Sequence, residues 1–272
     1  MRDHLAADKP QKRVRGTNEV AKLQTNGRNL EVEVAVFDKD GLLFDSQHFW
    51  KHLAEARLRE LSRLLEPEAL CEWSEWFGVR QTDGEIDGAD PNGILALASP
   101  QEEIAITASL LKRHGIGDWG RCRRAAADAF DRSDRDFSLY EALLPKRGFP
   151  AVFDRLREAG VTIGIATSDD RSRAIDSVAR YARADDLAFI VTPADVRRGK
   201  PYPDMLELIA ERTGARRERI AMIGDSFVDV QMASEAGCIG IGIPDDPEMR
   251  EKMRPFGAEI VDSLDDILVV GG

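Results

Sequence analysis

The sequence predicts an α/β protein in which a parallel β-sheet domain is interrupted by an inserted, all-helical domain. After residue 148, helical stretches alternate with short β-rich runs, the pattern of a parallel sheet covered by helices on both faces. Residues 47–147, by contrast, show helical periodicity alone. Such sheets bind ligands at the carboxyl ends of their strands, so the residues that follow each strand are the candidate site.

The first half of the chain contains an extension, one strand and the insert. Residues 1–30 carry seven Lys/Arg and three Asp/Glu with almost no apolar periodicity, so we expect a loosely ordered polar extension without an assigned function. Residues 31–37 alternate and then become apolar, which predicts a strand entering a buried sheet. Apolar residues at three- and four-residue steps predict the helices of the insert at residues 49–65, 68–77, 102–113 and 122–130.

The second half supplies the remaining strands. The β-rich runs are residues 161–167, 189–192, 220–223, 239–243 and 259–261. We therefore assign residues 31–46 and 148–272 to the sheet domain and residues 47–147 to the helical insert.

Composition narrows the class of function. The chain has 272 residues, 43% of them apolar, enough for a core domain and a smaller module. The net charge is −11, and about −15 outside the first 30 residues, which disfavours nucleic acids and anionic membranes as partners. Cys71, Cys122 and Cys238 form no CxxC pair, and no apolar run approaches the roughly 18 residues of a membrane span. We expect a cytoplasmic protein with a small polar ligand; the oligomeric state stays open.

The first predicted strand ends in two nearby carboxylates, Asp38 and Asp40. If the backbone stays extended, these side chains share a face and Lys39 points away. Like charges this close need a cation, and Mg²⁺ prefers such oxygen ligands. The alternative is a solvated acidic turn.

Three later strand ends also carry polar side chains. Thr167 and Ser168 offer hydroxyls to phosphate oxygens, although one of them is also expected to cap a helix. Lys200 precedes two prolines that favour an extended segment, and a surface lysine is the alternative. Asp225 and Asp229 stand one helical turn apart and can approach each other, although an acid at a helix N-terminus has an ordinary dipole explanation.

In order and separation, these four strand ends resemble the four motifs of the haloacid dehalogenase superfamily, over about residues 34–268. The insert falls where the phosphoglycolate-phosphatase-like branch carries a helical cap. The resemblance implies a Rossmann-like core with an all-helical cap, and a Mg²⁺-dependent phosphohydrolase.

The resemblance also implies roles for individual residues. Asp38 would be the nucleophile, and Asp40 the general acid and base, with its backbone carbonyl as a metal ligand. Thr167 would bind the phosphoryl group with help from Ser168, at a position more often asparagine in this branch.

The remaining implied roles concern charge and metal binding. Lys200 would neutralise charge on the nucleophile and on the phosphoryl oxygens. Asp225 would bind Mg²⁺ together with Asp38 and Asp40, and Asp229 would support the metal site or Lys200.

The same resemblance limits the substrate to a small phosphomonoester, such as phosphoglycolate or a sugar phosphate. A 2-haloacid dehalogenase is disfavoured because those enzymes lack the second aspartate, here Asp40. A sugar-phosphate mutase of the β-phosphoglucomutase type keeps Asp40 and the cap, and it remains the main alternative. A regulatory protein that keeps the fold without turnover is the alternative from another class.

Overall fold

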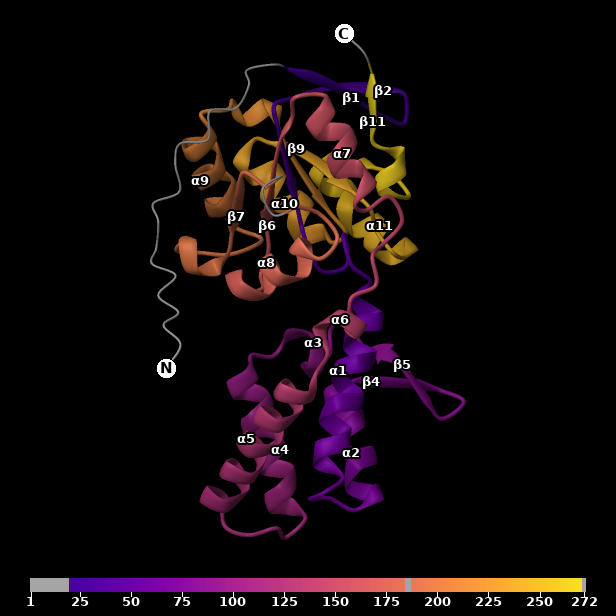
Figure 1. Cartoon of the computed structure of the whole chain (residues 1–272), viewed down its shortest axis with the longest axis vertical. Helices are drawn as coiled ribbons and strands as arrows, with labels where there is room; N and C mark the ends of the chain where they lie inside the picture. The colour runs from indigo at the N-terminus through magenta and orange to yellow at the C-terminus, as the bar shows by residue number, and fades with distance from the viewer. Residues whose placement is uncertain (1–19, 184–186, 271–272) are drawn as a thin grey trace. The chain divides into compact units, whose positions relative to one another are not determined.

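A computed structural model describes residues 20–183 and 187–270, which cluster into two compact units (Figure 1). One unit contains the described residues up to Leu43 together with those from Pro145 onward, and the other is Phe44–Leu144. Both boundaries lie three residues before those expected from the sequence. Within the described residues, the structure has no helix that is both long and apolar enough for a bilayer span.

The first unit is built on a parallel sheet. In the described part of the chain this sheet has six strands in the order β10-β9-β8-β3-β6-β7. The strands are β3 (Val34–Phe37), β6 (Thr162–Ala166), β7 (Phe189–Val191), β8 (Ile220–Gly224), β9 (Ile239–Gly242) and β10 (Glu259–Ile260). Phe37 is in register with Ile165 of β6 and Ile223 of β8, so these three strands end at the same edge.

Helices connect the strands and cover the sheet. They are α7 (Ala151–Glu158), α8 (Arg171–Ala179), α9 (Asp204–Thr213), α10 (Phe227–Ala236) and α11 (Pro247–Met253). Short 3₁₀ turns lie at Pro193–Asp195, Arg217–Arg219, Arg254–Phe256 and Leu264–Asp266. The strand order steps outward from β3 in both directions, and right-handed crossovers then place helices on both faces (Figure 1). The α/β prediction is confirmed.

A hairpin near the N-terminus differs from the sequence prediction. β1 (Ala21–Thr25) and β2 (Arg28–Val32) pair antiparallel, and β11 (Leu268–Val270) joins β1 from the other side. Asn26 and Gly27 both have positive φ, 48° and 79°, as a type I′ turn requires. The expectation of a loose extension is therefore wrong for residues 21–30, while residues 1–19 lie outside the described residues. The single strand expected at residues 31–37 is the end of β2 followed by β3.

The second unit is mainly helical. Its helices are α1 (Ser46–Leu61), α2 (Pro67–Phe77), α3 (Ile94–Leu97), α4 (Pro100–Arg113), α5 (Trp119–Asp136) and α6 (Leu139–Ala142). At its centre the rings of Trp73 and Phe77 stack at 4.1 Å, and Trp73 Nε1 donates to Thr107 Oγ1 over 3.0 Å. These aromatic residues of α2 are fully buried and serve packing.

The expectation that the insert is entirely helical needs a correction. Strands β4 (Val79–Thr82) and β5 (Glu85–Ala89) form an antiparallel hairpin inside the second unit. The Asp83-Gly84 pair between them adopts φ values of 54° and 83°, again suited to a type I′ turn. The hairpin forms because this turn reverses the chain within two residues.

Candidate active site

Asp38 lies at the carboxyl end of the central strand and is nearly buried, with 8% of its surface exposed. Its amide donates to Ile223 O of β8 over 2.9 Å, which fixes the backbone just beyond β3. The Asp38 carboxylate accepts a hydrogen bond from Lys200 Nζ at 2.5 Å. The nucleophile implied by the resemblance is therefore held against a cation.

Lys200 bridges two carboxylates. Its side chain is buried, and Nζ lies 2.6 Å from Asp229 Oδ1 as well as 2.5 Å from Asp38 Oδ1. The segment around it is a turn closed by Tyr202 N donating to Gly199 O over 3.0 Å, so the extended shape expected from the prolines is wrong. This turn carries the ammonium group to the strand ends.

Asp225 and Asp229 come from the strand–helix junction after β8. Ser226 N and Oγ donate to Asp229 Oδ2 over 3.2 and 3.1 Å, a capping box that starts α10 and fixes the aspartate. Among the described residues, Asp38, Asp225 and Asp229 form a group with one carboxylate oxygen each, all within 4.8 Å of one another. The approach expected for the two later aspartates is present.

Two glycines leave room for these carboxylates. A Cβ on Gly224 would lie 2.3 Å from the Asp229 side chain. A Cβ on Gly41 would lie 2.1 Å from Asp225 Oδ2, and Gly41 has φ +86°, a conformation that other residues rarely adopt. The absence of side chains at Gly41 and Gly224 is therefore part of the site.

The carboxylate group holds excess negative charge. Burial raises the pKa of Asp38 to about 6; the nearby Lys200 ammonium opposes the shift, and Asp229 adds to it. Burial, followed by repulsion from Asp38 and Asp229, raises the pKa of Asp225 well above its usual value. Burial alone would lower the pKa of Lys200, but Asp229 and Asp38 raise it, so this lysine stays charged.

The site fits a small divalent cation. Converging carboxylate oxygens are the donors that Mg²⁺ prefers, and among the described residues three such carboxylates, Asp38, Asp225 and Asp229, meet the single ammonium group of Lys200. Asp38 and Asp225 would hold the ion. Both carboxylate oxygens of Asp229 already have partners, because Oδ1 contacts Lys200 Nζ and Oδ2 accepts from Ser226 Oγ.

Asp40 takes a different position from the one that residue spacing predicted. Its side chain is 45% exposed, and its Oδ1 accepts from Lys39 Nζ at 2.5 Å, outside the carboxylate group found among the described residues. The expectation that Lys39 points away is wrong: its side chain is only 2% exposed and reaches Asp169 Oδ2 at 3.0 Å. β3 ends at Phe37, so the alternation of an extended strand no longer applies at residues 38–40.

Thr167 follows β6 and is buried, whereas Ser168 is exposed. The Thr167 amide donates to Val191 O over 3.1 Å, and its Oγ1 accepts from Asp169 N over 3.1 Å, which leaves the hydroxyl proton for a ligand. Asp170 caps α8 by accepting from Arg173 N over 2.9 Å. The expectation that Thr167 or Ser168 caps this helix is therefore wrong.

Sequence reasoning missed two lysines near the site. The strand pattern predicts only that Lys39 points away, whereas its contact is with Asp169, which lies 130 positions further along the chain and belongs to no predicted motif. Lys146 Nζ donates to Gly41 O over 2.7 Å and pairs with Asp245. No sequence signal identified either contact.

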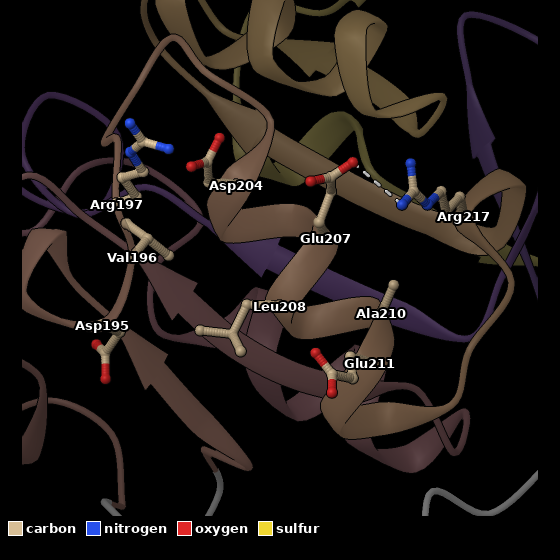
Figure 2. A pocket seen from close by; sticks show the side chains of 9 residues that line it. All are labelled: Asp195, Val196, Arg197, Asp204, Glu207, Leu208, Ala210, Glu211 and Arg217. Carbon is tan, nitrogen blue, oxygen red and sulfur yellow. Dashed lines mark ion pairs between the residues drawn. The ribbon is translucent and has the colours of Figure 1, made fainter.

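A separate hollow of about 540 Å³ lies in the first unit, between α9 and the segments after β7 and before β8 (Figure 2). Glu207 and Arg217 form an ion pair of 3.1 Å across part of its wall (Figure 2). None of the site residues predicted from the sequence lines it. The carboxylate group at the strand ends, rather than this hollow, is the candidate active site.

The order of the strands, the polar residues at their carboxyl ends and the inserted unit together define a class of protein. Residues 32–237 match the family model described as a haloacid dehalogenase-like hydrolase, and this protein belongs to that family. It is 34% identical over 223 residues to a phosphoglycolate phosphatase from Shigella boydii serotype 4 (strain Sb227), covering 78% of this chain and 81% of that protein. A match of 34% identity over 102 residues to the phosphoglycolate phosphatase of Escherichia coli (strain K12) covers 35% of this chain and 39% of the relative.

Solved structures share the fold at low sequence identity. A candidate β-phosphoglucomutase from Thermotoga maritima has a TM-score of 0.60 and 18% identity, covering 86% of this chain and 96% of that one. A predicted phosphoglycolate phosphatase from Haemophilus somnus 129pt has a TM-score of 0.57 and 15% identity, with the same coverage of both chains. The protein is thus a hydrolase of this family, related to phosphoric monoester hydrolases.

Proposed function

We propose that this protein is a Mg²⁺-dependent phosphatase that hydrolyses a small phosphomonoester through an aspartyl phosphate on Asp38. The observation that carries the proposal is the buried Asp38 carboxylate at the end of the central strand, paired with Lys200 and grouped with Asp225 and Asp229. Phosphoryl transfer needs positioning and charge neutralisation more than any other assistance. The fixed position of Asp38 supports the first requirement, and Lys200 with a bound Mg²⁺ would meet the second.

The proposed first step forms the phosphoenzyme. An Asp38 oxygen attacks phosphorus while the bond from phosphorus to the ester oxygen breaks, and Asp40 gives a proton to the departing alcohol. Mg²⁺, when bound, would supply positive charge against the carboxylates and the phosphoryl oxygens. Lys200 neutralises charge on Asp38, and the Thr167 hydroxyl donates to a phosphoryl oxygen with Ser168 nearby.

The second step hydrolyses the phosphoenzyme. Asp40 takes a proton from water, the water oxygen attacks phosphorus, and Asp38 leaves as a carboxylate with release of inorganic phosphate. A well-placed acid and base of this kind contributes roughly 10²–10⁴ in rate. Asp40 is exposed enough to meet both an alcohol and a water molecule.

A panel of phosphate esters, including phosphoglycolate and sugar phosphates, tests this function in the presence of Mg²⁺ and in excess EDTA. We expect phosphate release with Mg²⁺, its loss in EDTA and its return when Mg²⁺ is restored. Undiminished turnover in EDTA would refute the metal requirement. A mutase would form the same intermediate but pass the phosphoryl group to a sugar hydroxyl, so free phosphate appearing in step with substrate loss decides for hydrolysis. We place this activity in the cytoplasm.

A further inference from the structure

Lys39 lies in the sequence between the proposed nucleophile, Asp38, and the proposed acid and base, Asp40, yet none of the steps above gives it a role. A lysine side chain with only 2% of its surface exposed is costly unless its charge is compensated. The compensation comes from two carboxylates, Asp40 at 2.5 Å and Asp169 at 3.0 Å. The buried ammonium group of Lys39 therefore lies against the carboxylate of Asp40.

Asp169 is itself fixed from two directions. Its Oδ1 lies 3.2 Å from Arg173 Nε on α8, while Oδ2 faces Lys39. Its amide donates to Thr167 Oγ1, the hydroxyl proposed to bind the phosphoryl group. A continuous series of contacts therefore runs from Thr167 at the end of β6, through Asp169 and Lys39, to Asp40 beyond the end of β3.

We propose that Lys39 is a positioning residue for Asp40: its buried ammonium, anchored by Asp169, holds Oδ1 of Asp40 and leaves Oδ2 to exchange the proton. The inference rests on the proposed function, because it assumes that Asp40 is the acid and base. Without such a partner, a carboxylate that is 45% exposed would sample several rotamers. Orientation of a catalytic acid or base by a third group is a general requirement of such sites, and a displacement of about 1 Å is enough to cost roughly 10²-fold.

A double-mutant cycle separates positioning of Asp40 from general support of the fold. The variants are Lys39→Met, which keeps the length of the side chain without its charge, Asp40→Asn, and the two together. Rates are measured on an alkyl phosphate, whose leaving group needs a proton, and on nitrophenyl phosphate, whose leaving group does not. Arg171→Met is the matched control. Arg171 is the first residue of α8 and pairs with Asp195, so this variant also removes a paired cation, but one that does not contact Asp40.

We expect Lys39→Met to lower kcat on the alkyl phosphate by roughly 10- to 100-fold, with less loss of phosphoenzyme formation from nitrophenyl phosphate and little change in KM. In the Asp40→Asn background the same change should cost less than about twofold, because the group it positions is already gone. The Arg171→Met control should stay near wild type. Equal losses from Lys39→Met in both backgrounds would overturn the inference, as would wild-type activity of Lys39→Met.

A second variant, Asp169→Asn, keeps the test valid if Lys39→Met does not fold. Asp169→Asn keeps the size of the side chain but weakens its hold on Lys39, and it should reproduce the same non-additivity at smaller amplitude. If Lys39→Met fails to show the wild-type melting transition, the Asp169→Asn cycle decides. Failure of the proposed function would look different, because wild-type protein would then release no phosphate from any ester, or Asp38→Asn would keep its activity.

Discussion

Gly224→Ala tests the packing that brings Asp229 to Lys200. The new Cβ would lie 2.3 Å from the Asp229 side chain, whereas ordinary contacts begin near 3.4 Å, so the side chain must retreat by roughly 1 Å. That movement stretches the 2.6 Å contact between Asp229 Oδ1 and Lys200 Nζ towards the limit of a hydrogen bond. A displacement of about 1 Å in a catalytic group costs roughly 10²-fold, and overpacking costs about 1–3 kcal/mol of stability.

Gly240→Ala is the matched control, because Gly240 lies in the neighbouring strand β9 and a Cβ there would meet neighbours only at 3.5 Å or more. The assay is kcat on nitrophenyl phosphate with Mg²⁺, together with the melting temperature. We expect about a 100-fold loss for Gly224→Ala and activity within about twofold of wild type for Gly240→Ala. Full activity of Gly224→Ala, or an equal loss in both variants, would refute the reasoning.

Three further predictions concern the metal, pH and the second unit. Ca²⁺ should inhibit turnover in competition with Mg²⁺, because its looser coordination misaligns attack by Asp38; activity with Ca²⁺ equal to that with Mg²⁺ would count against this. In EDTA, the stability that protonated Asp38 contributes is fully present below about pH 4 and is lost as the pH rises through about 6. The melting temperature of Asp38→Asn should therefore rise relative to that of wild type between pH 4 and pH 7. A difference in melting temperature that stays constant over this range would contradict the prediction. We also propose that residues 44–144 act as a mobile lid. Backbone hydrogen exchange near residues 43–46 and 143–146 should then slow when a phosphate analogue binds, and unchanged exchange would contradict the proposal.

The sequence was informative where chemistry coincides with strand ends. Asp38, Thr167 and Asp225 each follow an apolar strand, and the parallel register of β3, β6 and β8 brings those ends to one edge. Topology therefore turned separate local signals into one site. The approach of Asp229 to Asp225 could be expected because the two residues stand one helical turn apart in the sequence.

The two hairpins and the positions of Lys39 and Asp40 differ from the sequence prediction, for different reasons. The hairpins at residues 21–32 and 79–89 carry Asn-Gly and Asp-Gly turns, a hairpin signal that the sequence contains and that the prediction did not use. The burial of Lys39 is different, because its partner Asp169 belongs to another strand end. Alternation within a strand cannot orient a side chain once the strand has ended, which is why Lys39 and Asp40 were placed wrongly.

The central claim is that Asp38 carries the phosphoryl group, and the most direct measurement is rapid-quench labelling followed by mass spectrometry of the peptide that contains Asp38. With nitrophenyl phosphate and Mg²⁺, we expect aspartyl phosphate on Asp38 in wild type and more of it in Asp40→Asn, where water attack lacks its base. We expect none in Asp38→Asn, because an amide is a poor nucleophile. Phosphate on another residue, or wild-type turnover by Asp38→Asn, would contradict the mechanism.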